Sequence, residues 1–80
     1  MKYTYNPQGT CSRHIEFEVE DGCLADVSFT GGCHGNLQGI SALVKGMEIG
    51  EVIKRLRGIK CGTKNTSCPD QLAQALEQIN

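Results

Sequence analysis

Residues 61–70 read CGTKNTSCPD, and this stretch decides how the last third of the chain folds. Ser67 can cap a helix, because its hydroxyl accepts hydrogen bonds from the free backbone N–H groups of the first turn. Asp70 stands three positions later, where a capping-box acid reaches back to the cap, and Pro69 fits the first turn. The stretch therefore predicts a helix that begins at about Cys68. Its apolar face follows helical spacing and comprises Leu72, Ala75, Leu76 and Ile79.

Two cysteines flank the loop that leads into this helix, namely Cys61 and Cys68. At a helix start, the free N–H groups and the positive end of the helix dipole favour a thiolate over a thiol. A thiolate is the form of cysteine that binds a metal ion or attacks a disulfide. The pair therefore predicts one wall of a thiolate site, although a helix start is also an ordinary place for a small residue.

Length and composition limit the classes of protein that this chain can represent. Eighty residues predict one domain, spanning residues 1–80, with a small core. Five cysteines are many for this length, and their odd number argues against a closed set of disulfides. Because no apolar run follows the first residues, we expect a reducing, cytoplasmic compartment, where clustered cysteines indicate metal or redox chemistry. The net charge of −1 and the short apolar stretches favour neither nucleic acid nor membrane as a partner.

Alternating apolar residues predict a β-hairpin in the first half of the chain. A two-residue turn at Asp21 and Gly22 would set the two apolar faces against each other, so we expect a three-residue loop over 20–22. The resulting register pairs Cys11 with Gly31. The same register pairs Val19 with Cys23, Phe17 with Ala25 and Ile15 with Val27, and it places Phe29 on the same apolar face.

The other segments complete an α+β fold. Residues 2–5 predict a short edge strand, and the glycine-rich turn TGGCHGN at 30–36 ends in Asn36, a good N-cap. A second helix is expected over 49–58. We therefore expect an antiparallel hairpin with an N-terminal edge strand, followed by three helices on one sheet face. The apolar face expected for the first helix comprises Leu37, Ile40, Leu43 and Val44.

The hairpin register predicts where the remaining cysteines lie. Cys11 and Cys33 fall at the open end of the hairpin, whereas Cys23 falls at the turn end, about 26 Å away at roughly 3.3 Å per residue. Cys23 is therefore expected to be a partly buried core residue outside the site. Four thiolates, from Cys11, Cys33, Cys61 and Cys68, would satisfy a tetrahedral zinc or iron site. His34 is a further candidate ligand, and whether the two cysteine pairs meet depends on helix packing.

Three motifs carry a resemblance to a known family. Residues 66–70 spell TSCPD, residues 31–36 spell GGCHGN, and residues 58–62 spell GIKCG. The chain resembles the TSCPD-domain family, which occurs as small stand-alone proteins and in the C-terminal region of adenosylcobalamin-dependent ribonucleotide reductases. The resemblance covers nearly the whole chain. It implies a zinc-binding cysteine cluster, and it implies a link to ribonucleotide reduction, with a reductase or another protein as partner.

A more distant resemblance concerns the U-type iron–sulfur cluster scaffolds. Their three cysteine positions correspond to Cys11, Cys33 and Cys68. The chain has Arg13 where that family has an aspartate and Ser67 where it typically has a histidine. Cys61 would add a fourth thiolate. These departures favour a closed structural site over one that hands its cluster on.

Three hypotheses about function follow. The first is a zinc-binding accessory or interaction module linked to ribonucleoside-diphosphate reduction. The second is an iron–sulfur cluster scaffold or carrier, and the third is a thiol-redox accessory in which Cys61 and Cys68 exchange electrons with a reductase. A reductase-related oxidoreductase activity of this chain alone is not expected. Eighty residues cannot house a radical-bearing barrel, a cobalamin site and a nucleotide pocket together. The sequence leaves the oligomeric state open.

Overall fold

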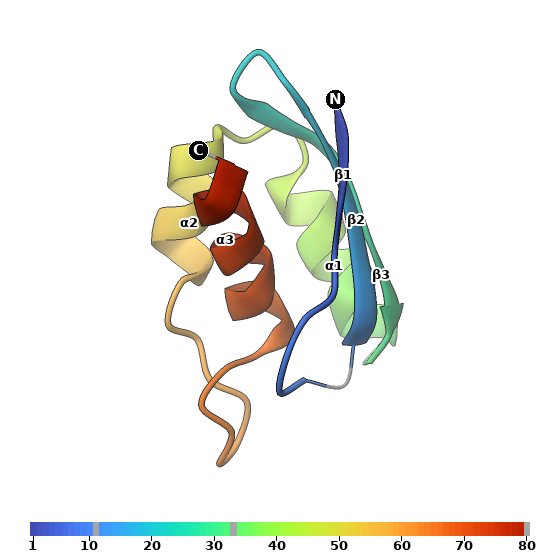
Figure 1. Ribbon diagram of the computed structural model, residues 1–80, viewed down its shortest axis with the longest axis vertical. Coiled ribbons are helices and arrows are strands. Elements are labelled where there is room, and N and C mark those ends of the chain that lie inside the picture. The colour runs from blue at the N-terminus through green and yellow to red at the C-terminus, as the bar shows by residue number, and fades with distance from the viewer. Residues whose placement is uncertain (11, 33, 80) are drawn as a thin grey trace.

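A computed structural model describes residues 1–10, 12–32 and 34–79, without the side chain of His34 (Figure 1). Three strands form one antiparallel sheet in the order β1-β2-β3, and three helices follow them in the chain. The expected α+β architecture is confirmed. The elements are β1 (Lys2–Tyr5), β2 (Ser12–Glu20), β3 (Cys23–Gly31), α1 (His34–Val44), α2 (Ile49–Leu56) and α3 (Cys68–Ile79).

The turn between β2 and β3 corrects the predicted register. Glu20 pairs with Cys23, so the turn has two residues, Asp21 and Gly22, and not the three expected. Their φ angles of 53° and 76° are those of a type I′ turn, which matches the right-handed twist of paired strands. The strands next pair Val19 with Leu24, so the predicted pairing of Val19 with Cys23 is wrong.

A β-bulge resolves the parity problem that had argued against this turn. The register shifts between the pairs Val19 with Leu24 and Glu18 with Asp26, which leaves Ala25 as the extra residue of β3. Leu24 and Val27 are consequently both buried, whereas Ala25 is only half-buried. Beyond the bulge, Phe17 pairs with Val27 and Ile15 with Phe29, in place of the predicted pairs Phe17 with Ala25 and Ile15 with Val27.

A second register shift lies at the open end of the hairpin. Ser12 pairs with Gly31 and His14 pairs with Thr30, so Arg13 is the extra residue there. The predicted partner of Gly31 was Cys11, and the structure instead places Ser12 there. The side chain of Ser12 is consequently buried at the end of β2, where only 3% of it is exposed.

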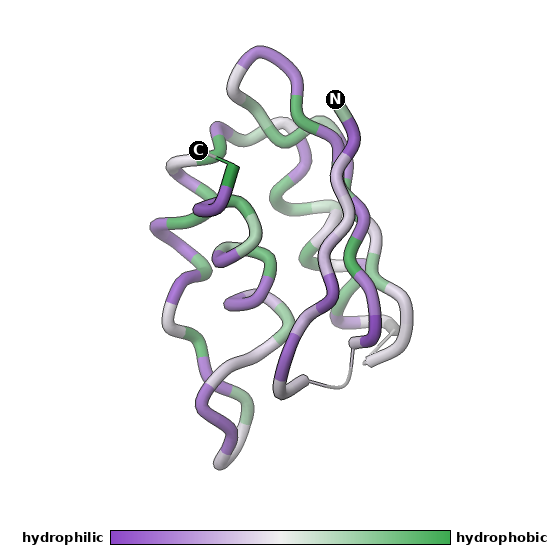
Figure 2. Tube along the Cα trace, viewed as in Figure 1, coloured by the Kyte–Doolittle hydropathy of each residue, from purple (hydrophilic) through white to green (hydrophobic). Residues whose placement is uncertain are grey.

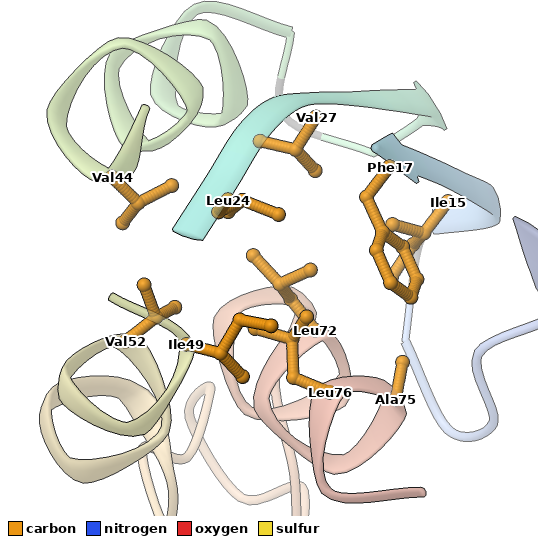
Figure 3. Close-up of a cluster of buried hydrophobic side chains, with 10 residues drawn as sticks. All are labelled: Ile15, Phe17, Leu24, Val27, Val44, Ile49, Val52, Leu72, Ala75 and Leu76. Carbon is orange, nitrogen blue, oxygen red and sulfur yellow. The ribbon is translucent and has the colours of Figure 1, made fainter. Parts of the chain in front are cut away.

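The hydrophobic core lies between the sheet and the helices, which all cover one sheet face (Figures 1 and 3). Tyr3 of β1 extends the sheet's apolar face by stacking on Phe17, with ring centroids 5.4 Å apart. The apolar face predicted for α3 is confirmed, with Ile79 half-buried at its end. The core side chains drawn in Figure 3 are Ile15, Phe17, Leu24, Val27, Val44, Ile49, Val52, Leu72, Ala75 and Leu76.

Helix α1 differs from its prediction in where it begins and in one residue of its apolar face. It begins at His34, two residues before the expected cap, Asn36. Leu43 is 79% exposed and does not belong to the apolar face, because helical geometry turns it by about 100° from the buried Val44. Helix α2 ends at Leu56, two residues before its expected end.

The loop between α2 and α3 projects from one end of the elongated molecule, and it is largely hydrophilic (Figures 1 and 2). The same end of the molecule holds the first turns of α1 and α3 and the open end of the hairpin. Segments that are far apart in the sequence therefore meet at this end.

Candidate functional site

Ser67 caps helix α3 as predicted. Its Oγ accepts a hydrogen bond from the backbone N–H of Asp70 over 3.1 Å and donates one to the carbonyl oxygen of Ile59 over 2.7 Å. The same hydroxyl thus satisfies a free donor of the helix and fixes the loop before it. Cys68 is the first residue of α3 and is half-buried.

The carboxylate of Asp70 does not play its predicted capping-box role. It is 2% exposed and turns toward the loop between α2 and α3. Its Oδ1 accepts from the backbone N–H of Gly58 over 2.7 Å and from Nη1 of Arg57 over 3.1 Å. Its Oδ2 accepts from the hydroxyl of Thr66 and from Nε2 of Gln74, the latter over 2.9 Å. Asp70 therefore joins the loop to the first two turns of α3.

These contacts keep Asp70 ionised. Burial by itself raises the pKa of this carboxyl group and is the largest single effect. The hydrogen bonds from Thr66, Gly58 and Gln74, together with the charge of Arg57, outweigh burial and hold the pKa below its ordinary value of 3.8. Four hydrogen-bond donors occupy most of the lone pairs of this carboxylate. Asp70 therefore anchors the loop and is a poor candidate for a metal ligand.

A second set of hydrogen bonds ties two further segments to the same turn of α3. The hydroxyl of Thr66 accepts from Nε2 of Gln71 over 2.9 Å, and Oε1 of Gln71 accepts from the backbone N–H of Gln8 over 3.0 Å. The backbone N–H of Cys61 donates to the carbonyl oxygen of Thr66 over 3.2 Å and closes the loop over 61–66. Both the loop that carries Cys61 and the segment that precedes β2 are therefore fixed to α3.

The structure brings Cys61 and Cys68 to one pocket of about 220 Å³. Cys61 is exposed at its rim and Cys68 is half-buried. Thr10, from the segment before β2, also lines this pocket. The apolar part of its wall is formed by Leu37, Ile40, Ile59 and Pro69. The loop and the helix start thus line one pocket, and the thiolate site predicted there stays a prediction.

The open end of the hairpin reaches the start of α3 at Cys68. The side chains of Ser12 and Cys68 share a hydrogen bond between Oγ and Sγ. A Cβ atom on Gly32 would lie 3.1 Å from the Oγ of Ser12, so the backbone of Gly32 passes directly over that hydroxyl. Ser12 follows Cys11 in the chain and Gly32 precedes Cys33. The neighbour of Cys11 therefore contacts Cys68, and the neighbour of Cys33 lies close to Ser12.

The predicted ligand set is only partly within the described structure. Cys11, Cys33 and the side chain of His34 lie outside the described residues, so their part in the site stays a prediction. Within residues 1–10, 12–32 and 34–79, no group of three or more His, Cys, Asp or Glu side chains is arranged to hold a metal ion.

Cys23 lies at the turn end of the hairpin, as expected. It pairs with Glu20 in the sheet and forms an isolated bridge with Glu48, and its side chain is half-buried. Cys68, in contrast, lies against Ser12 at the first residue of β2. The length of the hairpin separates the two cysteines, as the prediction required.

Sequence reasoning missed the polar residues that assemble this end of the molecule. Ser12, Arg57 and Gln71 had no assigned role, yet their contacts with Cys68, Asp70 and Gln8 span 56, 13 and 63 positions in the chain, respectively. The contacts of these three residues left no pattern in the sequence.

Together, the sheet, the three helices and the cysteines at a loop and a helix start define a small cysteine-bearing α+β domain. The family model for the TSCPD domain matches residues 1–80, so the chain belongs to the TSCPD domain family. No curated protein and no solved structure matches the chain. Among the described helices, none is long and apolar enough to cross a bilayer.

The structure gives a physical role to each residue of the motif at 66–70. Thr66 closes the cysteine loop and bonds to the carboxylate of Asp70, and Ser67 caps α3. Cys68 faces the pocket beside Pro69. Four residues of the motif thus place the fifth, Cys68, at the pocket shared with Cys61.

Proposed function

We propose that this chain is a zinc-binding TSCPD domain whose metal is held by the thiolates of Cys11, Cys33, Cys61 and Cys68. The observation that carries this proposal is the pocket of about 220 Å³ that Cys61 and Cys68 share. Four thiolates are a common ligand set for structural zinc. His34 is the alternative fourth ligand, since imidazole also suits zinc.

The donor chemistry at the pocket fits zinc better than a hard cation. Two sulfur atoms already border the pocket, whereas the nearby carboxylate of Asp70 is engaged by four hydrogen-bond donors. Soft thiolate ligands favour zinc or iron–sulfur clusters over magnesium or calcium. Zinc bound here would link the loop at 61–66, the start of α3 and the open end of the hairpin. It would thereby stabilise a domain with a small core.

The role we propose is that of an accessory or interaction module linked to ribonucleoside-diphosphate reduction in the cytoplasm. Membership of the TSCPD family supports this link. The pocket at the cysteines is smaller than the roughly 300–1,000 Å³ typical of small-molecule sites, which favours a structural metal over a bound nucleotide there. The proposed partner is a reductase or another protein. The reduction of ribonucleotides would be carried out by that larger reductase and not by this chain.

A second candidate function is thiol exchange, and one observation favours it. Cys61 is exposed and shares the pocket with Cys68, which is half-buried at a helix start. An accessible thiol that shares a pocket with a second cysteine is suited to dithiol exchange. In that case the thiols of Cys61 and Cys68 would reduce a disulfide of the reductase to a dithiol, and the two cysteines would themselves be oxidised to a disulfide. The resemblance to iron–sulfur scaffolds supplies the third alternative, a bound cluster.

Elemental analysis of protein purified anaerobically without chelator, with acid-labile sulfide measured on the same sample, tests the proposal. About one zinc per chain without sulfide is expected. A chelator should then lower the stability of the fold, because metal binding and folding are coupled. Iron together with sulfide would instead support an iron–sulfur cluster at this site. Metal-free protein with a reversible disulfide between Cys61 and Cys68 would support thiol exchange.

A further inference from the structure

The side chain of Ser12 is buried against a sulfur atom from the far end of the chain. Ser12 is the first residue of β2 and is 3% exposed, and its Oγ is hydrogen-bonded to the Sγ of Cys68, 56 positions later. Ser12 also pairs with Gly31 in the sheet, so its backbone is fixed by β3. A hydroxyl held in this way has little freedom to turn toward solvent.

The backbone of Gly32 approaches the side chain of Ser12 closely. A Cβ atom on Gly32 would lie 2.9 Å from Cδ1 of Leu37 and 3.1 Å from the Oγ of Ser12. Gly32 also has a φ of +76°, a conformation that side-chain-bearing residues rarely adopt. The hydroxyl therefore lies close both to the backbone of Gly32 and to the sulfur of Cys68, a residue that lines the pocket.

We propose that Ser12 is a positioning residue for the metal site, donating its hydroxyl hydrogen to the sulfur of Cys68. This inference rests on the proposed zinc function. A metal-bound cysteine is a thiolate without a proton, so only the hydroxyl can donate in this pair. The hydrogen bond orients the sulfur and offsets part of the negative charge of the half-buried thiolate.

The chemistry of this pair distinguishes positioning from simple packing. Residues that hydrogen-bond to metal ligands orient them, and their loss typically weakens metal affinity about 10- to 100-fold. A residue that only fills space would contribute to stability without changing the electronic state of the bound sulfur. The hydroxyl group is therefore the part of Ser12 that matters for the metal.

The test compares Ser12→Ala with Ser12→Thr, which keeps the hydroxyl, and with Ser41→Ala as a matched control. The hydroxyl of Ser41 donates to the carbonyl oxygen of Leu37 over 2.8 Å on the neighbouring helix, away from the sulfur. Zinc affinity is measured by competition with a chromophoric chelator, and the Co²⁺-loaded chain reports sulfur-to-metal charge transfer. Circular dichroism of each variant before metal is added verifies the fold.

Ser12→Ala should weaken zinc binding about 10- to 100-fold and shift the charge-transfer band of bound Co²⁺. Ser12→Thr should stay within about threefold of the wild-type affinity, and Ser41→Ala should match the wild type. Equal zinc affinity and equal spectra for the wild-type and Ser12→Ala chains overturn this inference alone. A folded Ser12→Thr variant as weak as Ser12→Ala also overturns it. A wild-type chain that binds no zinc overturns the proposed function, and this inference falls with it.

Discussion

The backbone N–H of Gly58 donates a hydrogen bond to Oδ1 of Asp70 over 2.7 Å. This bond joins the end of α2 to the first turn of α3, across the loop that carries Cys61. Because Thr66 bonds to the same carboxylate, both ends of the loop are fixed to one buried side chain. The relative position of Cys61 and Cys68 therefore depends on Asp70, although Asp70 itself does not line the pocket.

Replacement of Asp70 by asparagine should destabilise the fold. The amide has one oxygen acceptor where the carboxylate has two, and it carries no charge to attract Arg57, so at least two of the four donors lose their acceptor. We expect a loss of about 2–3 kcal/mol in the free energy of unfolding, measured with urea. The matched control is Glu77→Gln, which removes the other carboxylate bound by Arg57, at 2.9 Å, on the exposed side. If both variants unfold at the same urea concentration, Asp70 is not the anchor described here.

The stability of the fold should depend on acid through Asp70. The folded state lowers the pKa of this carboxyl below 3.8, so its contribution is fully present above the unfolded value. That contribution is lost as the pH falls through the lower, folded pKa. Urea unfolding between pH 7 and pH 2.5 should show the difference between wild type and Asp70→Asn shrinking only below about pH 4. A difference that stays constant over this range would contradict the role of the ionised carboxylate.

Gly32→Ala should destabilise the open end of the hairpin. The added methyl group would lie 2.9 Å from Leu37 and 3.1 Å from Ser12, and the positive φ of +76° adds strain. We expect a cost of about 1–3 kcal/mol in thermal or urea unfolding. Gly39→Ala is the control, because a Cβ there meets no atom within 4 Å and Gly39 lies inside α1. That variant should gain up to about 1 kcal/mol, and a similar loss in both variants would show that steric contact at Gly32 is unimportant.

The local signals in the sequence were sufficient for most of the fold. The cap at Ser67, the apolar stripe of α3 and the edge strand at Lys2–Tyr5 all appear in the structure. Each of these features depends on residues within one or two turns of each other, where propensity and periodicity act directly. The same holds for the shared position of Cys61 and Cys68, which one short loop connects.

Features that depend on compensation between distant residues could not be derived in this way. In regular strands a two-residue turn at Asp21 and Gly22 would set the apolar faces of β2 and β3 against each other, but the bulge at Ala25 restores their match. The contact of Ser12 with Cys68 depends on how α3 packs against the sheet, which no local pattern encodes. Asp70 was assigned to the capping box because the sequence did not show that Gly58 and Arg57 approach it.

The most direct test of the central claim is the zinc content of two cysteine variants, Cys68→Ser and Cys23→Ser. Both are purified anaerobically beside the wild-type chain and analysed for zinc per chain. Cys68 lies at the shared pocket and Cys23 at the far end of the hairpin. We expect Cys23→Ser to keep about one zinc per chain and Cys68→Ser to lose it or to bind it far more weakly. Zinc retained by Cys68→Ser, or lost from Cys23→Ser, would contradict the metal site proposed at the start of α3.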